Sequence, residues 1–354
     1  MKNSLTIQSY RGPYKASFEN DLRFLDALKE KPGIWAIDRN VFNVYRQHFD
    51  SIGSDSIVLI DAKEEEKTVD SAMRLCRELV TKSCKRNTDF VSVGGGITQD
   101  ITGFVASALY RGLNWTYVPT TLLAQADSCI GSKTSLNLDS YKNLVGTFYP
   151  PKRIFISYEF TKTLNPKEIF SGFGEIVKLH LMQAKNLGDF SALAHRLKND
   201  DPSNLLYDSL LIKKEYIEED EFDEGRRKLL NYGHCFGHAL ESASEFTIPH
   251  GLAVVAGMIF ASAVSLKRQL IDGEVFDFMV KQILSPSFHG ELLNLQNKFF
   301  DTDNLWQAMR KDKKRTGEGV AIILPHRDSH LLLVQDLSRE EFTWGLETLK
   351  KLLA

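Results

Sequence analysis

Cysteine is scarce in this sequence, and neither sign of charge is in excess. The four cysteines, Cys76, Cys84, Cys129 and Cys235, form no Cys-x-x-Cys pair, which excludes a dense disulfide framework and fits a reducing cytoplasm. A formal net charge of −2 provides no basic surface for nucleic acid, although local basic pockets can still bind small anions. We therefore expect a cytoplasmic protein whose main ligand is a small molecule.

Long hydrophobic runs and repetitive segments are also missing. The longest uncharged apolar run, residues 251–266, is shorter than the roughly 20 residues of a membrane-spanning helix and predicts a buried helix. The N-terminal segment MKNSLTIQSYRGPYK lacks the apolar core of a signal peptide. With 43% hydrophobic and 25% charged residues among 354, the composition is that of a soluble globular protein with room for two domains.

The most informative stretch is NYGHCFGH, residues 231–238. His234 and His238 are four residues apart, so on a helix both imidazoles lie on one face, and His250 can approach them from the start of the next helix. Glu175, in the segment SGFGEIVK, is the best candidate for an acidic ligand. Two imidazoles and one carboxylate suit a catalytic zinc that keeps one coordination position open.

Two alternatives to this interpretation are open at this point. A histidine pair with this spacing also occurs in ordinary protein cores and on surfaces. Cys235 is a further candidate ligand, although on a helix it points away from the face that His234 and His238 share. The remaining segments of the chain favour the metal site.

Alternating strand and helix patterns occupy the first half of the chain. Short β-rich runs at residues 34–37, 57–60, 90–93, 115–118 and 154–157 look like buried strands, and residues 65–83 carry a helical pattern. This alternation predicts a mainly parallel sheet covered by helices, with ligands at the carboxyl ends of the strands. After residue 165 long helical patterns dominate, with late strand signals at 320–324 and 331–334. We place a domain boundary near Asn165.

A glycine-rich turn follows the third predicted strand, where Gly94, Gly95 and Gly96 lead into a helix. Glycines there let the backbone approach a pyrophosphate, and the amino end of a helix favours its negative charge. The spacing is not G-x-G-x-x-G, and a turn of this kind is often purely structural. The turn alone therefore leaves the choice between a nucleotide site and a structural turn open.

Polar segments follow at residues 111–112, 118–128, 131–134 and 141–146. Their Asp, Lys and Asn side chains, interleaved with Gly, Ser and Thr, are typical of loops that hold a polyhydroxylated, phosphorylated ligand. The alternative is a set of solvated loops with exposed lysines.

Cations precede the histidine pair in the second half. We interpret Lys213, Arg227 and Asn231 as lying on a helix that leads into the histidines, where an anion could bind. The alternatives are that Lys213 extends to solvent and that Arg227 pairs with nearby acids. Residues 312–315, DKKR, form another cation cluster of a kind that is usually a solvated face.

Together these segments resemble dehydroquinate synthase and the wider sugar phosphate cyclase family, from about Asp38 to Lys314. The resemblance implies an α/β Rossmann-like N-terminal domain over residues 1–165 that binds NAD, and a mainly α-helical domain over residues 166–354 that binds metal and substrate. It also implies an active site in the cleft between the domains, zinc or alternatively cobalt as the metal, and a homodimer.

The resemblance assigns roles by position. Glu175, His234 and His250 match metal ligands, and His238 matches a residue that binds phosphate and transfers protons. The remaining positions that match catalytic or substrate-binding residues are Asp127, Lys133, Lys142, Asn143, Lys178, Lys213, Arg227, Asn231, Lys314 and Arg111, of which Arg111 reaches the neighbouring subunit's site in this family. The positions that match NAD contacts are Asp38, Asn40, Glu64, Lys67, Gly95, Gly96, Asp100, Thr120, Thr121, Phe160 and Thr163.

Lys213, Arg227 and Asn231 match the residues that meet a carboxylate in dehydroquinate synthases. A buried cation pair without its anion carries a heavy desolvation cost, so we expect a carboxylated substrate, 3-deoxy-D-arabino-heptulosonate 7-phosphate. The implied reaction is a phosphate-eliminating lyase reaction: NAD oxidises C5, phosphate leaves by β-elimination, the hydride returns, and an aldol closure yields 3-dehydroquinate. It belongs to the shikimate pathway of aromatic amino acid biosynthesis.

Several residues depart from the family pattern and keep other activities open. Gln99 and Ser132 stand where glycine is usual, as does Tyr141, and the segments 62–63 and 173–174 are also unusual. The alternatives are an amino-dehydroquinate or cyclitol synthase of secondary metabolism, a metal-dependent polyol or glycerol phosphate dehydrogenase, which would accumulate NADH, and a non-catalytic paralogue. Retention of Lys133, Lys178 and the three metal-ligand positions argues against the last.

Overall fold

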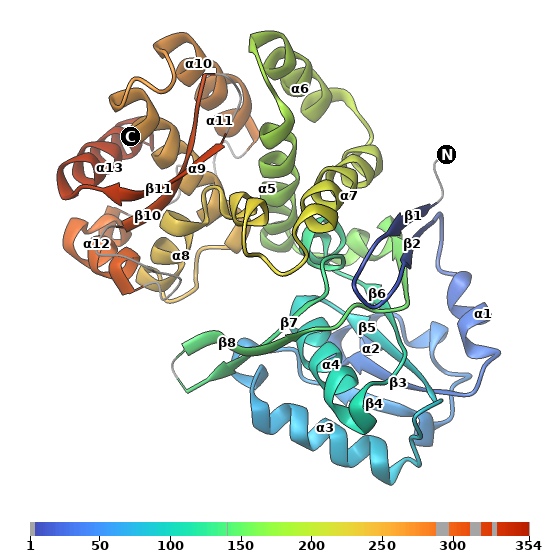
Figure 1. Cartoon of the computed structure of the whole chain (residues 1–354). Coiled ribbons are helices and arrows are strands. Elements are labelled where there is room, and N and C mark those ends of the chain that lie inside the picture. Colours follow the sequence, from blue (N-terminus) through green and yellow to red (C-terminus); the bar gives the residue numbers. More distant parts are fainter. Residues whose placement is uncertain (1–3, 140, 288–296, 312–319, 328–330, 354) are drawn as a thin grey trace. The chain divides into compact units, whose positions relative to one another are not determined.

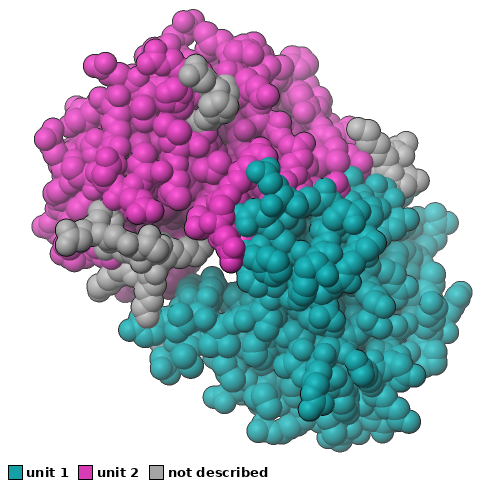
Figure 2. Space-filling view, in the orientation of Figure 1, with its two compact units in different colours: residues 1–165, 217–222 teal, residues 166–216, 223–354 magenta. Residues whose placement is uncertain are grey.

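The chain divides into two units, and each contains a cluster of buried hydrophobic residues. The computed structural model describes residues 4–139, 141–287, 297–311, 320–327 and 331–353. Unit 1 comprises Met1–Asn165 and Ile217–Phe222, and unit 2 comprises Pro166–Tyr216 and Asp223–Ala354 (Figure 2). A short segment from the second half of the chain therefore belongs to unit 1.

Unit 1 is built on a sheet of seven strands in the order β1-β2-β9-β6-β5-β3-β4 (Figure 1). Its strands are β1 (Ser4–Ile7), β2 (Tyr14–Glu19), β3 (Gly33–Asp38), β4 (Ile57–Ile60), β5 (Asp89–Gly94), β6 (Trp115–Pro119) and β9 (Arg153–Ser157). Only β1 and β2 pair antiparallel, and all other neighbours are parallel. All five predicted runs are strands, whereas β1 and β2 were not predicted.

Helices cover both faces of this sheet. They are α1 (Phe24–Lys29), α2 (Arg39–Val44), α3 (Val69–Thr81) and α4 (Gly96–Ala108). Side chains alternate along a strand, so Val91 and Val93 of β5 join the core that contains Phe24 and Leu25 of α1. Ser92, between them, faces the other way and hydrogen-bonds Thr102 of α4. The two sides of β5 are therefore covered by different helices.

A hairpin replaces part of the predicted polar loops. β7 (Lys133–Leu138) and β8 (Tyr141–Phe148) pair antiparallel, with Ser135 opposite Gly146. The loop prediction for these residues is wrong because their polar side chains are compatible with a strand that is largely exposed, particularly along β8. Lys133 and Asn143 thus lie on a regular two-stranded element.

Unit 2 packs helices around α9 (His250–Lys267). The other helices among the described residues of unit 2 are α5 (Pro166–Gln183), α6 (Leu187–Asn199), most of α7 (Pro202–Glu219), α8 (His234–Ala243), α10 (Gly273–Phe278), α11 (Ser285–Ser287), α12 (Thr302–Lys311) and α13 (Arg339–Leu353). The late strands β10 (Val320–Pro325) and β11 (Leu331–Leu337) form an antiparallel pair, as predicted. α9 has the length and apolarity of a membrane span, but 83% of that stretch is buried inside the protein. It is the central helix of unit 2.

Candidate active site

Three side chains that can ligate a metal meet in unit 2. Glu175 lies on α5, whereas His234 and His250 are the first residues of α8 and α9. The Nε2 atoms of both histidines lie 3.5 Å from Glu175 Oε1, and one ligand atom from each residue lies within 4.8 Å of the others. Ligands about 2.0–2.1 Å from a tetrahedral zinc stand roughly 3.4 Å apart. The observed spacing fits a divalent ion.

Glycines at the helix crossings bring these ligands together. A Cβ at Gly174 would lie 2.5 Å from the carbonyl oxygen of Gly251, so the backbones of α5 and α9 touch. A Cβ at Gly257 would lie 1.9 Å from the carbonyl oxygen of Gly233, which closes the crossing of α8 and α9. Each ligand is next to one of these glycines in the chain: Glu175 to Gly174, His234 to Gly233 and His250 to Gly251.

The outer ring nitrogens of both histidines are held by acceptors. His234 Nδ1 lies 3.1 Å from the carbonyl oxygen of Tyr232, and His250 Nδ1 lies 3.2 Å from Glu241 Oε2. A carbonyl or carboxylate oxygen only accepts hydrogen bonds, so Nδ1 carries the proton and donates. In the neutral ring Nε2 then presents its lone pair toward Glu175, which is the tautomer that binds a metal.

Charge in this cluster is concentrated on the fully buried Glu175, which forms an ion pair with Lys178, itself 1% exposed. Burial alone would raise the pKa of Glu175, but Lys178 and the imidazoles hold that pKa well below its ordinary value. Burial, with Lys178, lowers the pKa of His234 well below its ordinary value. For His250, the carboxylates of Glu175 and Glu241 outweigh burial and raise the pKa to about 10.

The donor set fits a divalent metal. Glu175 Oε1 is buried and receives no well-formed hydrogen bond from the described residues, and the two imidazole Nε2 atoms lie 3.5 Å from it. A buried anionic oxygen without a partner is costly, and a cation between it and the two Nε2 atoms would satisfy it. Nitrogen and carboxylate ligands with a coordination position left open are the pattern of catalytic zinc.

Replacement of Glu241 by alanine is expected to weaken metal binding by about 10- to 100-fold, since Glu241 orients His250 and loss of a carboxylate that orients a metal-binding histidine costs about this much. Competition with a chelating indicator measures the change. Glu241→Gln, whose amide oxygen still accepts from Nδ1, should lose less, and the exposed Glu274→Ala serves as the control. Unchanged affinity in Glu241→Ala would remove this residue from the site.

Two buried cations lie in unit 2 near the histidines in sequence. Lys213 is 6% exposed and Arg227 is 4% exposed, so Lys213 does not extend to solvent. The prediction of one helix from Lys213 into the histidines is wrong: α7 ends at Glu219, and Arg227 lies on a separate 3-10 helix, Arg226–Asn231. Asn231 Nδ2 donates to the Lys228 carbonyl oxygen at 3.0 Å.

His238 lies one turn after His234 but outside the cluster centred on Glu175. It is exposed, with its ring centroid 5.3 Å from that of His234 and 6.0 Å from that of His250. His238, Glu241 and His250 form a second group with metal-ligand spacing. The arrangement leaves His238 accessible for proton transfer or phosphate binding.

The candidate nucleotide contacts of unit 1 follow the carboxyl ends of neighbouring parallel strands. Asp38 ends β3, the glycine turn follows β5, and Thr120 and Thr121 follow β6, whose Pro119 pairs with Gly94. Glu64 and Lys67 follow β4, and Phe160 and Thr163 follow β9. Because the carboxyl ends of parallel strands share an edge, the structure brings these segments to one edge of the sheet. Asp38 also caps α2 by accepting from the Asn40 N–H.

The amino end of α4 suits a pyrophosphate. Gly95 is its N-cap and no side chain caps the helix, which leaves backbone N–H groups for an anion. A Cβ at Gly96 would meet nothing closer than Ser128 Oγ at 3.8 Å, so a ligand can approach this backbone. The Tyr117 hydroxyl supports the glycine turn, since it lies 3.0 Å from the carbonyl oxygen of Gly94 and 3.2 Å from that of Gly95.

Asp100 ties the hairpin to α4. Its Oδ1 accepts from the Ser135 N–H at 2.9 Å, and its Oδ2 accepts from Lys67 Nζ at 2.8 Å and from Ser135 Oγ at 2.9 Å. Burial raises the pKa of Asp100 even though Lys67 opposes this. Two residues predicted to contact the cofactor therefore pair with each other, and the charge of Lys67 is compensated within unit 1.

Asn137 connects the hairpin to the segment after β4. Its Oδ1 accepts from the Asn143 N–H at 2.9 Å, where Asn143 takes a φ of +53°, and its Nδ2 donates to Glu64 Oε1 at 2.9 Å. Lys142 Nζ lies 3.4 Å from the same Glu64 oxygen. The structure thus gathers Glu64, Lys142 and Asn143, three predicted site residues, around Asn137.

Ser132 occupies a strained turn. Its φ is +61°, and Lys133 N donates to the Gly131 oxygen at 2.8 Å around it, which marks a γ-turn of the rare, strained type. Its buried hydroxyl has no hydrogen-bond partner among the described residues. The glycine that is usual at this position would avoid both costs.

Ser132→Gly is therefore expected to stabilise unit 1 by about 1 kcal/mol, the balance between relief of a left-handed residue and the entropy of glycine. The thermal unfolding midpoint of unit 1 should rise by about 2–4 °C, which differential scanning calorimetry would measure. Ser132→Ala keeps the strain and removes only the hydroxyl, so it should gain less. A lower thermal midpoint in Ser132→Gly than in the unmodified protein would contradict the proposed strain at Ser132.

The remaining predicted site residues are Asp127, Lys133, Arg111 and Lys314. Asp127 lies half-buried on a π-helical turn, Ala124–Ser128, and Lys133 is exposed at the start of β7. Arg111 is exposed on a turn in which Tyr110, Arg111 and Gly112 all have positive φ, at 53°, 60° and 127°. Lys314 lies outside the described residues.

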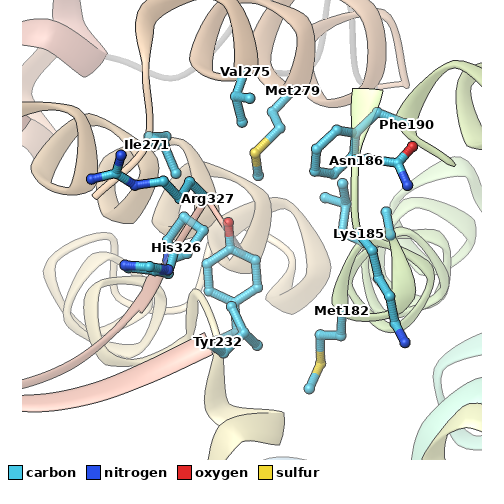
Figure 3. Close-up of a pocket in the computed structure, with 14 residues that line it drawn as sticks. Met182, Lys185, Asn186, Phe190, Tyr232, Ile271, Val275, Met279, His326 and Arg327 are labelled. Carbon is cyan, nitrogen blue, oxygen red and sulfur yellow. The ribbon is translucent and has the colours of Figure 1, made fainter. Parts of the chain in front are cut away.

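A cavity in unit 2 lies beside Tyr232 (Figure 3). Its walls include Phe190 and Met279, and the charged ends of Lys185 and Arg327 point away from its interior (Figure 3). Since no charged group from the described residues converges on it, this cavity does not suit a sugar phosphate.

Comparison with known proteins places this geometry in a family. The family models for the N-terminal and C-terminal parts of 3-dehydroquinate synthase match residues 57–171 and 172–315. The 3-dehydroquinate synthase of Pelagibacter ubique is 36% identical over 82% of this chain and 81% of its own length. That of Dictyoglomus thermophilum is 32% identical over 96% and 91%. The chain belongs to the 3-dehydroquinate synthase family.

Solved structures support the same fold for this family member. The 2-epi-5-epi-valiolone synthase of Streptomyces hygroscopicus, solved with NAD⁺ and Zn²⁺, aligns with a TM-score of 0.82 at 22% identity over 96% of this chain and 97% of its own. A 2-deoxy-scyllo-inosose synthase, complexed with carbaglucose-6-phosphate, NAD⁺ and Co²⁺, gives 0.79 at 23% identity over 98% and 99%. A glycerol dehydrogenase of Schizosaccharomyces pombe gives 0.62 at 15% identity over 98% and 90%. The expected fold is confirmed.

Sequence reasoning missed several supporting residues of this family member. Glu241 and Tyr232 orient the two histidines, Tyr117 holds the glycine turn, and Asn137 gathers the hairpin residues. The sequence carried one usable signal: Glu241 follows His238 by three residues on the same helix, which puts both on one face.

Proposed function

We propose that this protein is a 3-dehydroquinate synthase that converts 3-deoxy-D-arabino-heptulosonate 7-phosphate to 3-dehydroquinate and phosphate. The observation that carries the proposal is the meeting of Glu175, His234 and His250 around a buried carboxylate oxygen that receives no hydrogen bond from the described part of the chain, in a chain of this family. Curated relatives over most of the chain bear the same name.

Each unit supplies one part of the machinery. When bound, NAD⁺ accepts a hydride from the substrate and returns it within the turnover, and the divalent metal, zinc in this proposal, polarises substrate oxygens. Unit 1 binds NAD through the strand edge and the uncapped amino end of α4. Unit 2 holds the metal through Glu175, His234 and His250, with Lys178 fixing the carboxylate. Related solved cyclases bind NAD⁺ with Zn²⁺ or Co²⁺.

The polar side chains orient the substrate and move protons. Lys213 and Arg227 are buried cations and bind the substrate carboxylate, which offsets their desolvation. His238 is exposed beside His234 and exchanges a proton with the phosphate or a substrate hydroxyl. In unit 1, Asp127 accepts hydrogen bonds from substrate hydroxyls, Asn143 donates to them or accepts from them, and Lys133 binds phosphate. Lys142, Asn231 and Lys314 complete the proposed contacts.

The proposal extends to assembly and location. We propose a cytoplasmic homodimer in which Arg111 reaches the site of the neighbouring subunit. The run of positive φ angles at residues 110–112 supports it, because such backbone strain is retained where a side chain must be presented in one direction. Tyr110 fixes this turn through a hydrogen bond from its hydroxyl to the Cys84 oxygen at 2.9 Å.

The deciding experiment incubates metal-loaded protein with NAD⁺ and the heptulosonate phosphate, and follows released phosphate, NADH absorbance and product mass together. Phosphate release with the mass of dehydroquinate and no accumulated NADH is the expected result. Accumulation of NADH would indicate a dehydrogenase. Turnover only of sedoheptulose 7-phosphate or of an amino analogue would keep the cyclase chemistry but overturn the assignment of Lys213 and Arg227 to a carboxylate.

A further inference from the structure

Two reciprocal hydrogen bonds join α4 to the turn that carries Asp127. The Gln99 side-chain amide Nε2 donates to the Ser128 carbonyl oxygen at 2.6 Å, and Ser128 Oγ donates to Gln99 Oε1 at 2.7 Å. Gln99 is 5% exposed, so water does not compete effectively for these bonds. We call this pair the Gln99–Ser128 clasp.

The turn that the clasp holds is π-helical. It covers Ala124–Ser128 and is closed by a hydrogen bond from Cys129 N to the Ala124 oxygen at 2.9 Å. Single π-helical turns are rare and are frequent at functional sites. On its other side, Gln125 Nε2 donates to the Pro119 and Ser157 oxygens at 3.1 and 2.9 Å. Asp127 therefore lies in a widened turn that two glutamine amides hold from two directions.

The glycine turn has supports of its own. The Tyr117 hydroxyl lies 3.0 Å from the Gly94 oxygen, and Thr120 N donates to the same oxygen at 3.0 Å. Gln99 N also donates to the Gly95 oxygen at 3.0 Å, a backbone bond that does not depend on the side chain. Removal of the Gln99 side-chain bonds should therefore release the turn of Asp127 and leave the glycine turn in place.

We propose that Gln99 is a positioning residue that fixes the direction of Asp127 through the π-helical turn. The glycine that the family resemblance gives for this position has no side chain and would make neither bond, so both bonds depend on the Gln99 side chain. The role of Asp127 toward a substrate hydroxyl rests on the proposed function, whereas the hold of the clasp on the turn does not.

Gln99→Met tests this directly, because methionine has a similar length and shape and makes neither hydrogen bond. Amide hydrogen exchange of Cys129, which reports on the closing bond of the π-helical turn, should become about tenfold faster, the change expected from losing two neutral hydrogen bonds. The value of kcat/KM for the sugar phosphate should fall about tenfold, while the Kd of NAD⁺ changes less than twofold. Ser128→Ala should show part of both effects, and the double variant should match Gln99→Met alone.

Gln8→Met, at an exposed glutamine of unit 1, is the matched control. Unchanged exchange at Cys129 in Gln99→Met would overturn the proposal. Faster exchange with unchanged kcat/KM would overturn it as well, since the clasp would then only support packing. If the unmodified protein does not turn over the heptulosonate phosphate, the proposed function fails, and the exchange experiment still decides whether the clasp holds the turn.

Discussion

Substitution of Glu175 by glutamine is expected to abolish metal binding and reduce kcat/KM by at least about a thousandfold. Glu175 supplies the only anionic ligand of the cluster formed with His234 and His250, and a neutral amide cannot replace its charge toward a divalent ion. The free energy of unfolding of unit 2 should fall by about 3 kcal/mol, because Lys178 is left in the interior without its partner. Metal content after gel filtration and calorimetry measure the two effects.

A second variant separates the loss of metal from the loss of stability. In Glu175→Gln with Lys178→Met both members of the buried ion pair are neutral, so stability should largely return while metal stays absent. Glu168→Gln makes the same change at an exposed position of α5 and should keep both properties. Stoichiometric zinc in Glu175→Gln would show that this carboxylate is not a ligand.

Arg227→Ala is expected to reduce kcat/KM for the carboxylated substrate by about 10²- to 10³-fold, the cost of losing a buried charge-assisted contact. Metal content should stay near that of the unmodified protein, because Arg227 is not in the cluster of Glu175. Steady-state kinetics with the heptulosonate phosphate, together with metal analysis, would check both parts. An equal loss of metal and activity would contradict the role in carboxylate binding.

The neighbouring arginine provides the matched control for this variant. Arg226 is exposed, and its guanidinium lies 4.5 Å from the centroid of the Tyr216 ring. Arg226→Ala removes a positive charge of the same kind one residue away, so it tests whether net charge alone explains the loss. We expect its kcat/KM to stay within about twofold, since a surface cation–π contact contributes only about 0.5–1 kcal/mol.

Sequence patterns predicted the parallel core of unit 1 because its strands are buried on both faces and therefore read as short apolar runs. The same reasoning missed the hairpin β7–β8, since its stability depends on distant partners: Ser135 donates to Asp100, and Asn137 donates to Glu64. The break after α7 was also missed. α7 ends at Glu219, and Gly225, with φ −131° and ψ −114°, precedes the 3-10 helix that follows. The polar residues between them gave no clear end to the helical pattern.

For the site, the spacing of His234 and His238 indicated a metal. The choice of Glu175 as the acidic ligand came from the segment SGFGEIVK that contains it. Only the folded chain shows why these residues meet. Glu241 and Tyr232 could not be assigned from spacing alone, because each acts on a histidine ring through one specific nitrogen. The strain at Ser132, although its position was noted, depends on a backbone angle that the sequence does not reveal.

The glycine contacts between α5, α8 and α9 also limit how the protein can evolve. Gly174, Gly251 and Gly257 are not metal ligands themselves, yet a single methyl group at any of them would overlap a neighbouring backbone. Random drift at these positions would therefore separate the metal ligands while leaving every ligand residue intact. A related protein with a larger residue at one of these glycines would lose activity although it keeps Glu175, His234 and His250. A search for the catalytic residues alone would wrongly classify that protein as active.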